Sequence, residues 1–226
     1  LNGDRLAPIF GGEPLDDGNG LKGLWGQLKE TRDPNNQTAK KSYDVFGRGV
    51  KDISPLDTVA LPTGEGSYEY LSNYFKVLKK QRVESGQAAV IEVVEFYDGL
   101  GRLIEKKTPT ENPNVFVVSG QTEYNSRGLP EYQYLPFFSN IPRDTIDHPV
   151  VSTRPRSRAV YDGVGRVIES RNPDNTFSTI RYGDWMTETG DENGHMQKSY
   201  FDANGRLIKK EEYLGADGRG APVYQT

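Results

Sequence analysis

A six-residue phrase recurs along this chain and limits what the chain can fold into. Each good copy begins with Tyr or Phe followed by Asp, with Gly three residues and Arg four residues after the Asp. The four copies are Tyr43, Asp44, Gly47 and Arg48; Tyr97, Asp98, Gly101 and Arg102; Tyr161, Asp162, Gly165 and Arg166; and Phe201, Asp202, Gly205 and Arg206. A degenerate copy runs from Tyr124 to Glu131, with Leu129 at the Arg position. Such repetition indicates stacked supersecondary units.

Each copy has the chemistry of a β-hairpin turn. The Asp carboxylate can accept a hydrogen bond from the backbone amide two residues on, and the Gly can adopt a positive φ. A type I turn followed by a left-handed Gly is a common hairpin loop. The aromatic residue would end one strand and the Arg would start the next, so we expect the motif ring and guanidinium to face each other. The repeat therefore predicts self-specifying hairpins.

Shorter phrases lie between the copies. Asp33–Asn36 and Asp191–Gly194 resemble half-copies, and Tyr182–Asp184 falls between the third and fourth copies. A strand–turn–strand unit of roughly 20 residues fits this rhythm. Because a lone hairpin cannot bury its face, we expect the hairpins to stand side by side in one continuous, curved sheet. The fold class predicted from the sequence is thus all-β.

The composition is typical of β-sheets that expose at least one face to water. Only 34% of the residues are hydrophobic and the mean hydropathy is −0.72, yet the chain has 13 Tyr, 9 Phe and 2 Trp, unlike a disordered chain. The net charge of −4 gives no basic footprint for nucleic acid. Three lysine pairs, which we interpret as solvated strand ends, are Lys79-Lys80, Lys106-Lys107 and Lys209-Lys210.

The chain has no cysteine, which excludes disulfides and thiolate metal sites. No apolar run is long enough to span a membrane. The sequence begins at Leu1 without an initiator Met, so we expect a fragment of a larger protein.

Three segments depart from the repeat. Residues 1–30 are predicted to be lead-in strands and loops, and residues 31–226 the repeat region. Within Ser67–Val83 the spacing of apolar residues allows either a helix or strands, and the β-rich neighbours favour strands. Residues 135–155 carry four prolines, which predicts an ordered excursion between two parts of the sheet.

No constellation indicates an enzyme. We interpret the two histidines, His148 and His195, as surface residues, and there is no nucleophile elbow. Oxygen-rich clusters occur at Asp16, Asp17 and Asn19 and at Asp191, Glu192 and Asn193, but neither completes a calcium loop, so turn chemistry is the better account. We expect no catalytic residue, no cofactor and no metal. The aromatic residues that could face a ligand are Trp185 and Trp25, with packing of the wall as the alternative.

The Tyr-Asp-x-x-Gly-Arg series resembles the YD repeats of the Rhs family, and the resemblance covers about Thr31 to Leu214. Relatives with such repeats include B and C components of bacterial insecticidal toxin complexes, wall-associated bacterial proteins and animal teneurins. Asp33–Thr38 and Asn172–Phe177 resemble the phrases that link YD units. The resemblance implies a spirally wound sheet that forms part of a hollow shell. The autoproteolytic Asp signature of bacterial members is not found, so no catalytic residue is carried over.

The resemblance implies an architectural function. The first hypothesis is a shell segment that encloses or presents a toxin or effector polypeptide, with other shell segments or that cargo as partners. The alternative is an extracellular adhesion or carbohydrate-binding scaffold with a glycan or cell-surface partner. Both imply a secreted or cell-surface bacterial protein without a nucleic-acid partner, and an enzyme is the least favoured reading.

Overall fold

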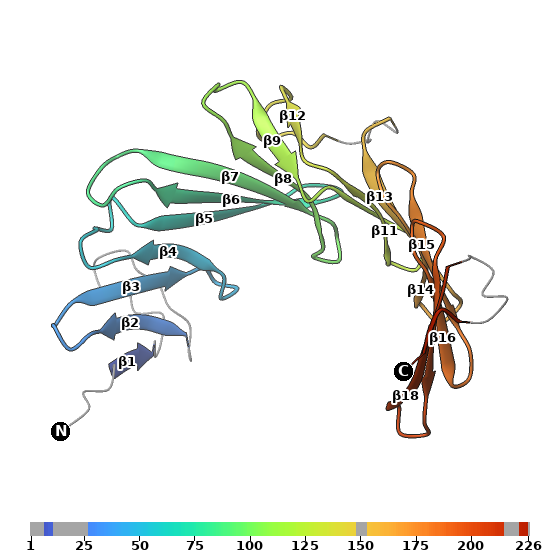
Figure 1. Ribbon diagram of the computed structural model, residues 1–226. Coiled ribbons are helices and arrows are strands. Elements are labelled where there is room, and N and C mark those ends of the chain that lie inside the picture. The colour runs from blue at the N-terminus through green and yellow to red at the C-terminus, as the bar shows by residue number, and fades with distance from the viewer. Residues whose placement is uncertain (1–6, 11–26, 148–152, 215–221, 226) are drawn as a thin grey trace. The chain divides into compact units, whose positions relative to one another are not determined.

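The computed structural model describes residues 7–10, 27–147, 153–214 and 222–225, and every regular element in these ranges is a β-strand (Figure 1). The all-β prediction is confirmed. All strand pairs in these ranges are antiparallel, and most join strands that are consecutive in the chain. The fold is therefore a succession of hairpins, as the repeated turn chemistry requires.

The strands form two sheets, whereas one continuous sheet was expected. The first sheet has ten strands in the order β1 to β9 followed by β12, and the second has nine, in the order β10, β11 and then β13 to β19. The strands of the first sheet are β1 Ala7–Phe10, β2 Leu28–Arg32, β3 Thr38–Tyr43, β4 Gly49–Ile53, β5 Gly64–Tyr70, β6 Phe75–Arg82, β7 Val90–Tyr97, β8 Leu103–Pro109, β9 Phe116–Ser119 and β12 Phe137–Ser139. Those of the second sheet are β10 Thr122–Tyr124, β11 Pro130–Tyr134, β13 Arg156–Tyr161, β14 Val167–Arg171, β15 Phe177–Tyr182, β16 Met186–Gly190, β17 Met196–Phe201, β18 Leu207–Tyr213 and β19 Tyr224–Gln225.

The chain also divides into two compact units that follow the sheets. One unit comprises Leu1–Val118 with Phe137–Asp147, and the other Ser119–Pro136 with His148–Thr226. The break falls at the end of β9, where Gly120 has a φ of 65°. Strand β12 pairs with β9 at this edge of the first sheet, so β10 begins the second sheet instead of pairing with β9.

The ambiguous segment Ser67–Val83 forms strands, as predicted. It supplies most of β5 and all of β6, which pair with each other from Gly64↔Gln81 to Tyr70↔Phe75. Val77 is buried in β6. Strand β6 pairs with a neighbouring strand on each side, and this pairing outweighs the helix-like spacing of the segment's apolar residues.

The described residues of the proline-rich excursion are 135–147 and 153–155, and of these Phe137–Asp147 belong to the first unit. Its strand β12 pairs with β9 at the edge of the first sheet (Figure 1). A short edge strand tolerates neighbouring prolines, because one side of an edge strand has no ladder to complete. Residues 140–147, which follow β12, are called the strap below.

The described residues bury few apolar side chains. Those of the first sheet are Ile53, Val77, Val94, Phe96 and Val118, and those of the second are Tyr134 and Tyr213. Most other strand residues are only half-buried. The low hydrophobic content therefore matches sheets that are held largely by backbone pairing and polar side-chain contacts.

Candidate functional site

Eight turns in the described residues share one hydrogen-bonding pattern. The first residue donates its N–H to the carbonyl of the fifth, and the fourth donates its N–H to the carbonyl of the first. The turns span residues 33–37, 44–48, 98–102, 125–129, 162–166, 172–176, 191–195 and 202–206. Their fourth residues, all with positive φ, are Asn36, Gly47, Gly101, Gly128, Gly165, Asn175, Gly194 and Gly205. The half-copies and linking phrases are therefore complete turns, which sequence reasoning missed because Asn replaces Gly in two of them.

The motif Asp organises each YD turn as predicted. In the second copy, Asp98 Oδ1 accepts the N–H groups of Leu100 and Arg102, each at 2.9 Å. Oδ2 accepts Arg102 Nε at 2.7 Å. Burial raises the pKa of Asp98, but the hydrogen bonds and charge of Arg102 outweigh burial and leave the pKa below its ordinary value. The carboxylate therefore closes the turn in its ionised form.

In two of the four YD copies, the motif Arg has a different aromatic partner from the expected one. The Arg166 guanidinium lies 4.1 Å from the ring centre of Tyr182 in β15, and Arg48 lies 4.1 Å from that of Tyr68 in β5. Both rings come from a later strand and not from the motif Tyr. Since the motif Asp holds Nε, the flat guanidinium extends along the sheet and joins one hairpin to the next.

Tyrosine hydroxyls connect a hairpin to the preceding strand of the sheet. Tyr43 donates to the Leu28 carbonyl at 2.8 Å, and Tyr161 donates to the Pro130 carbonyl at 2.6 Å. In both cases the acceptor lies on or next to the preceding strand of the sheet. In the first and third copies the motif Tyr thus bonds to the preceding strand while the motif Arg contacts a later one, so these two copies make contacts between hairpins as well as the turn. Tyr97 of the second copy instead donates to Glu95 of its own strand.

The left-handed turn position gives a direct test. Gly101 has a φ of 77°, and a Cβ added there would meet no atom within 4 Å. We expect Gly101→Ala to cost about 1–2 kcal/mol of unfolding free energy, from backbone strain alone. Gly101→Asn should cost clearly less, because Asn36 and Asn175 already occupy this position elsewhere. Denaturant unfolding of the two variants measures the difference, and equal stabilities would refute this account of the turn.

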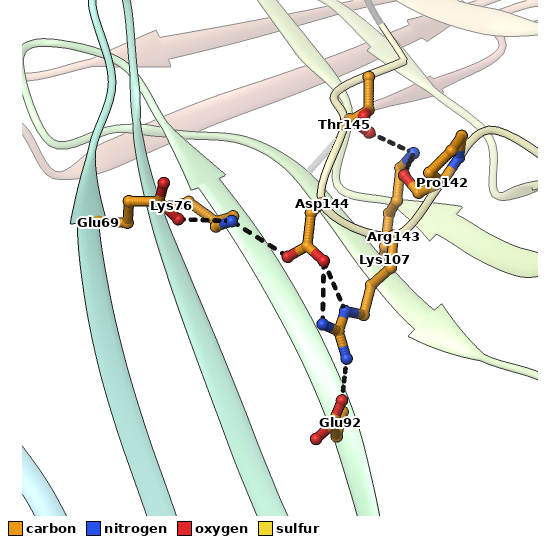
Figure 2. A network of polar contacts seen from close by, with 8 residues as sticks. All are labelled: Glu69, Lys76, Glu92, Lys107, Pro142, Arg143, Asp144 and Thr145. Carbon is orange, nitrogen blue, oxygen red and sulfur yellow. Dashed lines mark hydrogen bonds and ion pairs between the residues drawn. The ribbon is translucent and has the colours of Figure 1, made fainter.

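A charged cluster lies buried beneath the strap, contrary to the interpretation of Lys106-Lys107 as a solvated strand end. Lys107 and Glu105 in β8 are fully buried, and Asp147 of the strap is 3% exposed. Lys107 Nζ lies 3.0 Å from Asp147 Oδ2 and 3.8 Å from Glu105 Oε1. It also donates to the Thr145 carbonyl at 2.5 Å (Figure 2). The Asp147 N–H donates to both oxygens of Glu105 at 3.0 Å. The ammonium thus fixes the strap to the sheet.

A second, more exposed network holds the start of the strap. Asp144 accepts Lys76 Nζ at 3.1 Å and Arg143 Nη2 at 2.9 Å (Figure 2). Arg143 also pairs with Glu92 in β7, and Lys76 pairs with Glu69 in β5 at 2.6 Å. Charges from β6 and β7 therefore converge on two strap residues. Lys107 and Glu105, which also contact the strap, lie opposite the buried Val94 and Phe96, so the strap is anchored on that face of the first sheet.

A tyrosine–carboxylate cluster lies on β17 and β18 of the second sheet. Glu211 accepts the hydroxyls of Tyr200 at 2.8 Å and Tyr213 at 2.9 Å, and pairs with Lys209 at 2.6 Å. These contacts, with that of Lys209 the largest, lower the pKa of Glu211 to about 2. The hydrogen bond to Glu211 raises the pKa of Tyr200 to about 12.

The cluster predicts a pH window for the second sheet. The contribution of ionised Glu211 to the unfolding free energy is fully present above pH 4.5 and is lost as the pH falls towards about 2. The contribution of the protonated Tyr200 hydroxyl to the unfolding free energy is fully present below pH 10.0 and is lost as the pH rises towards about 12. We expect Glu211→Gln to bring the Tyr200 titration back towards 10.0 in NMR of ring-labelled tyrosine. The neighbouring Glu212→Gln is the control, and an unchanged Tyr200 titration in Glu211→Gln would contradict the assignment.

The remaining candidate residues are dispersed. Trp185 is 60% exposed in the turn between β15 and β16, whereas Trp25 and His148 lie outside the described residues, as do Asp16, Asp17 and Asn19. His195 occupies the Arg position of its turn, with Nδ1 3.1 Å from Asp191. Asp191 also accepts the N–H groups of Asn193 and His195, so this acidic cluster serves the turn.

The described part of the chain consists of hairpins and the contacts between them. Within it, no three His, Asp or Glu side chains come together as metal ligands would. Nor do these residues include a helix with the length and apolar character needed to cross a membrane. What the geometry provides is a set of turns and contacts that build and join hairpins.

Comparisons with known proteins give a fold relationship. No protein-family model matches the chain, and no curated protein does. Among solved structures, the chain is similar to "Crystal Structure of TcdB2-TccC3-Cdc42", with a TM-score of 0.67 and 16% identity, and to "Crystal Structure of TcdB2-TccC3", with a TM-score of 0.58 and 18% identity. It is also similar to the Photorhabdus luminescens Tc holotoxin pore with a mutated TccC3, with a TM-score of 0.59 and 16% identity. Each match covers 87% of this chain but only 14–16% of the solved chain. The chain therefore has the fold of a segment of these toxin-complex proteins.

Proposed function

We propose that this chain is a wall segment of an Rhs-type shell that encloses or presents a toxin or effector polypeptide. The observation that carries the proposal is the likeness to TcdB2-TccC3 structures over 87% of the chain. The eight shared turns support it, because a wall made of one repeated hairpin can be extended without a compact core. Its partners would be neighbouring wall segments and the cargo, and its place would be outside the cell that makes it.

The proposed mechanism is steric and needs no catalytic residue. Hairpins joined within each sheet by Arg–Tyr stacking and by tyrosine hydroxyls would make that sheet a barrier, and the cargo would be kept from its targets because it cannot pass the wall. The strap adds thickness to the first sheet where its charged residues anchor it to β6, β7 and β8.

The test uses the full-length protein that contains this chain, prepared with its cargo. We expect the cargo to survive a protease that degrades it when it is free, and cryo-electron microscopy to show density inside a closed wall. Rapid digestion of the cargo in the intact protein, or a solid domain without internal density, would overturn the proposal.

Carbohydrate adhesion is a second candidate, and Trp185 is the observation that favours it. An indole 60% exposed on a turn can stack on a sugar ring. Glycan-array binding that is lost in Trp185→Ala, but kept in a variant of the exposed turn residue Val164, would support adhesion. If no glycan on the array bound the protein, the adhesion hypothesis would be refuted.

A further inference from the structure

The two faces of the second sheet differ sharply in charge. Residues that lie opposite each other in neighbouring strands point to the same face, and faces alternate along each strand. The register pairs Ala159 with Ser170 and Ser170 with Ser178, and it pairs Thr187 with Ser199. We call this side of β13–β17 the neutral face. The opposite side, which carries Arg158 opposite Arg171, is called the charged face.

All charged residues of β13–β17 lie on one side. They are Arg156, Arg158, Glu169, Arg171, Arg181, Glu188 and Lys198. The structure describes every residue of these five strands, and none on the neutral face is charged. Beyond these strand residues, Arg166 of the turn after β13 lies over Tyr182 at the rim of that side, and Lys210 and Glu212 in β18 pair with each other at 3.0 Å. The turns alone specify the hairpins, so hairpin formation does not require all charged side chains of five strands to lie on one face.

The charged face is built to meet water and to hold partners. Its side chains cross-link one another, as in Arg171 with Glu169 at 3.0 Å and Lys198 with Glu188 at 3.5 Å. Arg156 lies 3.9 Å from the ring centre of Tyr132. Arg and Tyr are the residue types that dominate binding hot spots, so a polypeptide in contact with this face would find many anchors.

The neutral face offers few such anchors. Its central side chains are mostly short hydroxyls and one amide, with two apolar side chains among them: Ser170, Ser178, Thr189, Gln197 and Ser199, and Ala159 and Ile180. Tyr161 and Tyr182 lie on this side at one rim, but their hydroxyls are engaged by backbone carbonyls. Ser and Thr are under-represented in hot spots, and an uncharged surface neither attracts nor repels chain segments of either sign.

We propose that the neutral face of β13–β17 is the side of the wall that lies against the enclosed polypeptide. This inference rests on the proposed shell function and adds to it the direction in which this part of the wall faces. The neutral face contacts the cargo without trapping it, and the charged face keeps the exterior soluble.

Cysteine mapping in the full-length, cargo-loaded protein tests the orientation. This chain has no cysteine, so one introduced thiol is unique within it once any cysteines elsewhere are replaced by Ser. Ser178→Cys and Thr179→Cys form a matched pair, since they are adjacent in β15, similar in size and on opposite faces. Each is treated with a maleimide attached to a polymer too large to enter a closed shell, before and after mild denaturation opens it.

We expect Thr179→Cys to react in the intact protein and Ser178→Cys to react only after opening. A short photo-crosslinker on Cys at 178 should then form adducts with the cargo. Reaction at 178 with protection at 179, reaction at both in the intact protein, or adducts at 178 with another wall segment or a second copy would each overturn the orientation. Protease resistance of the cargo is read separately, so a wrong orientation with protected cargo is distinguishable from failure of the shell function itself.

Discussion

We expect Lys107→Met to lower the unfolding free energy of the first sheet by about 3–5 kcal/mol, since removing one partner of a buried ion cluster leaves the others uncompensated. Methionine keeps much of the lysine volume, so the loss reports the charge and not a cavity. Glu105 and Asp147 would remain buried without the ammonium, and the Thr145 carbonyl would lose its donor. The strap should detach before the sheet unfolds.

Denaturant unfolding combined with amide hydrogen exchange measures this effect. Exchange should accelerate in β8 and at the Asp147 amide, which donates to Glu105 in the native protein. Lys106→Met is the matched control, because Lys106 immediately precedes Lys107 in β8 and points to the opposite face. The control should change stability by no more than about 0.5 kcal/mol. Similar stabilities of the two variants would show that the buried cluster does not hold the strap.

Local rules predicted the turns and the strand class well. Asp98 and its counterparts accept the amide two residues on, and the motif glycines take positive φ, because both effects depend only on a few consecutive residues. The strands of Ser67–Val83 followed from the β-rich neighbours. Such inferences need no knowledge of what lies across the sheet.

Contacts between distant segments could not be predicted in this way. Lys107 looked like a solvated residue because nothing near it in sequence indicates that Asp147 covers it. The break into two sheets depends on where β12 pairs, and the partner of Arg166 depends on the following strand. The neutral face was also hidden, since it emerges only when the register aligns five strands. Each miss is a matter of tertiary pairing that local propensity does not contain.

The second large effect is expected for Asp98→Ala, which removes two backbone hydrogen bonds and the pair with Arg102 from one turn. Bonds to a charged acceptor contribute about 1.5–3 kcal/mol each at most, but water can replace part of them here, so we expect a loss of about 2 kcal/mol. Asp98→Asn should lose less, because Asn125 accepts the equivalent amides at 2.9 and 3.1 Å in the degenerate copy.

Stability measured at acidic pH distinguishes the contribution of the Asp98 charge from that of its hydrogen bonds. The folded pKa of Asp98 lies below 3.8, so its ionic contribution is fully present above that pH and is lost as the pH falls through the lowered value. The stability difference between wild type and Asp98→Asn should therefore be constant at neutral pH and shrink in acid. Asp52→Ala, at an exposed Asp paired with Lys41 in the same sheet, is the control and should have little effect. If Asp98→Ala were as mild as Asp52→Ala, the backbone alone would specify the hairpin, and the recurrence of Asp in the repeat would need another cause.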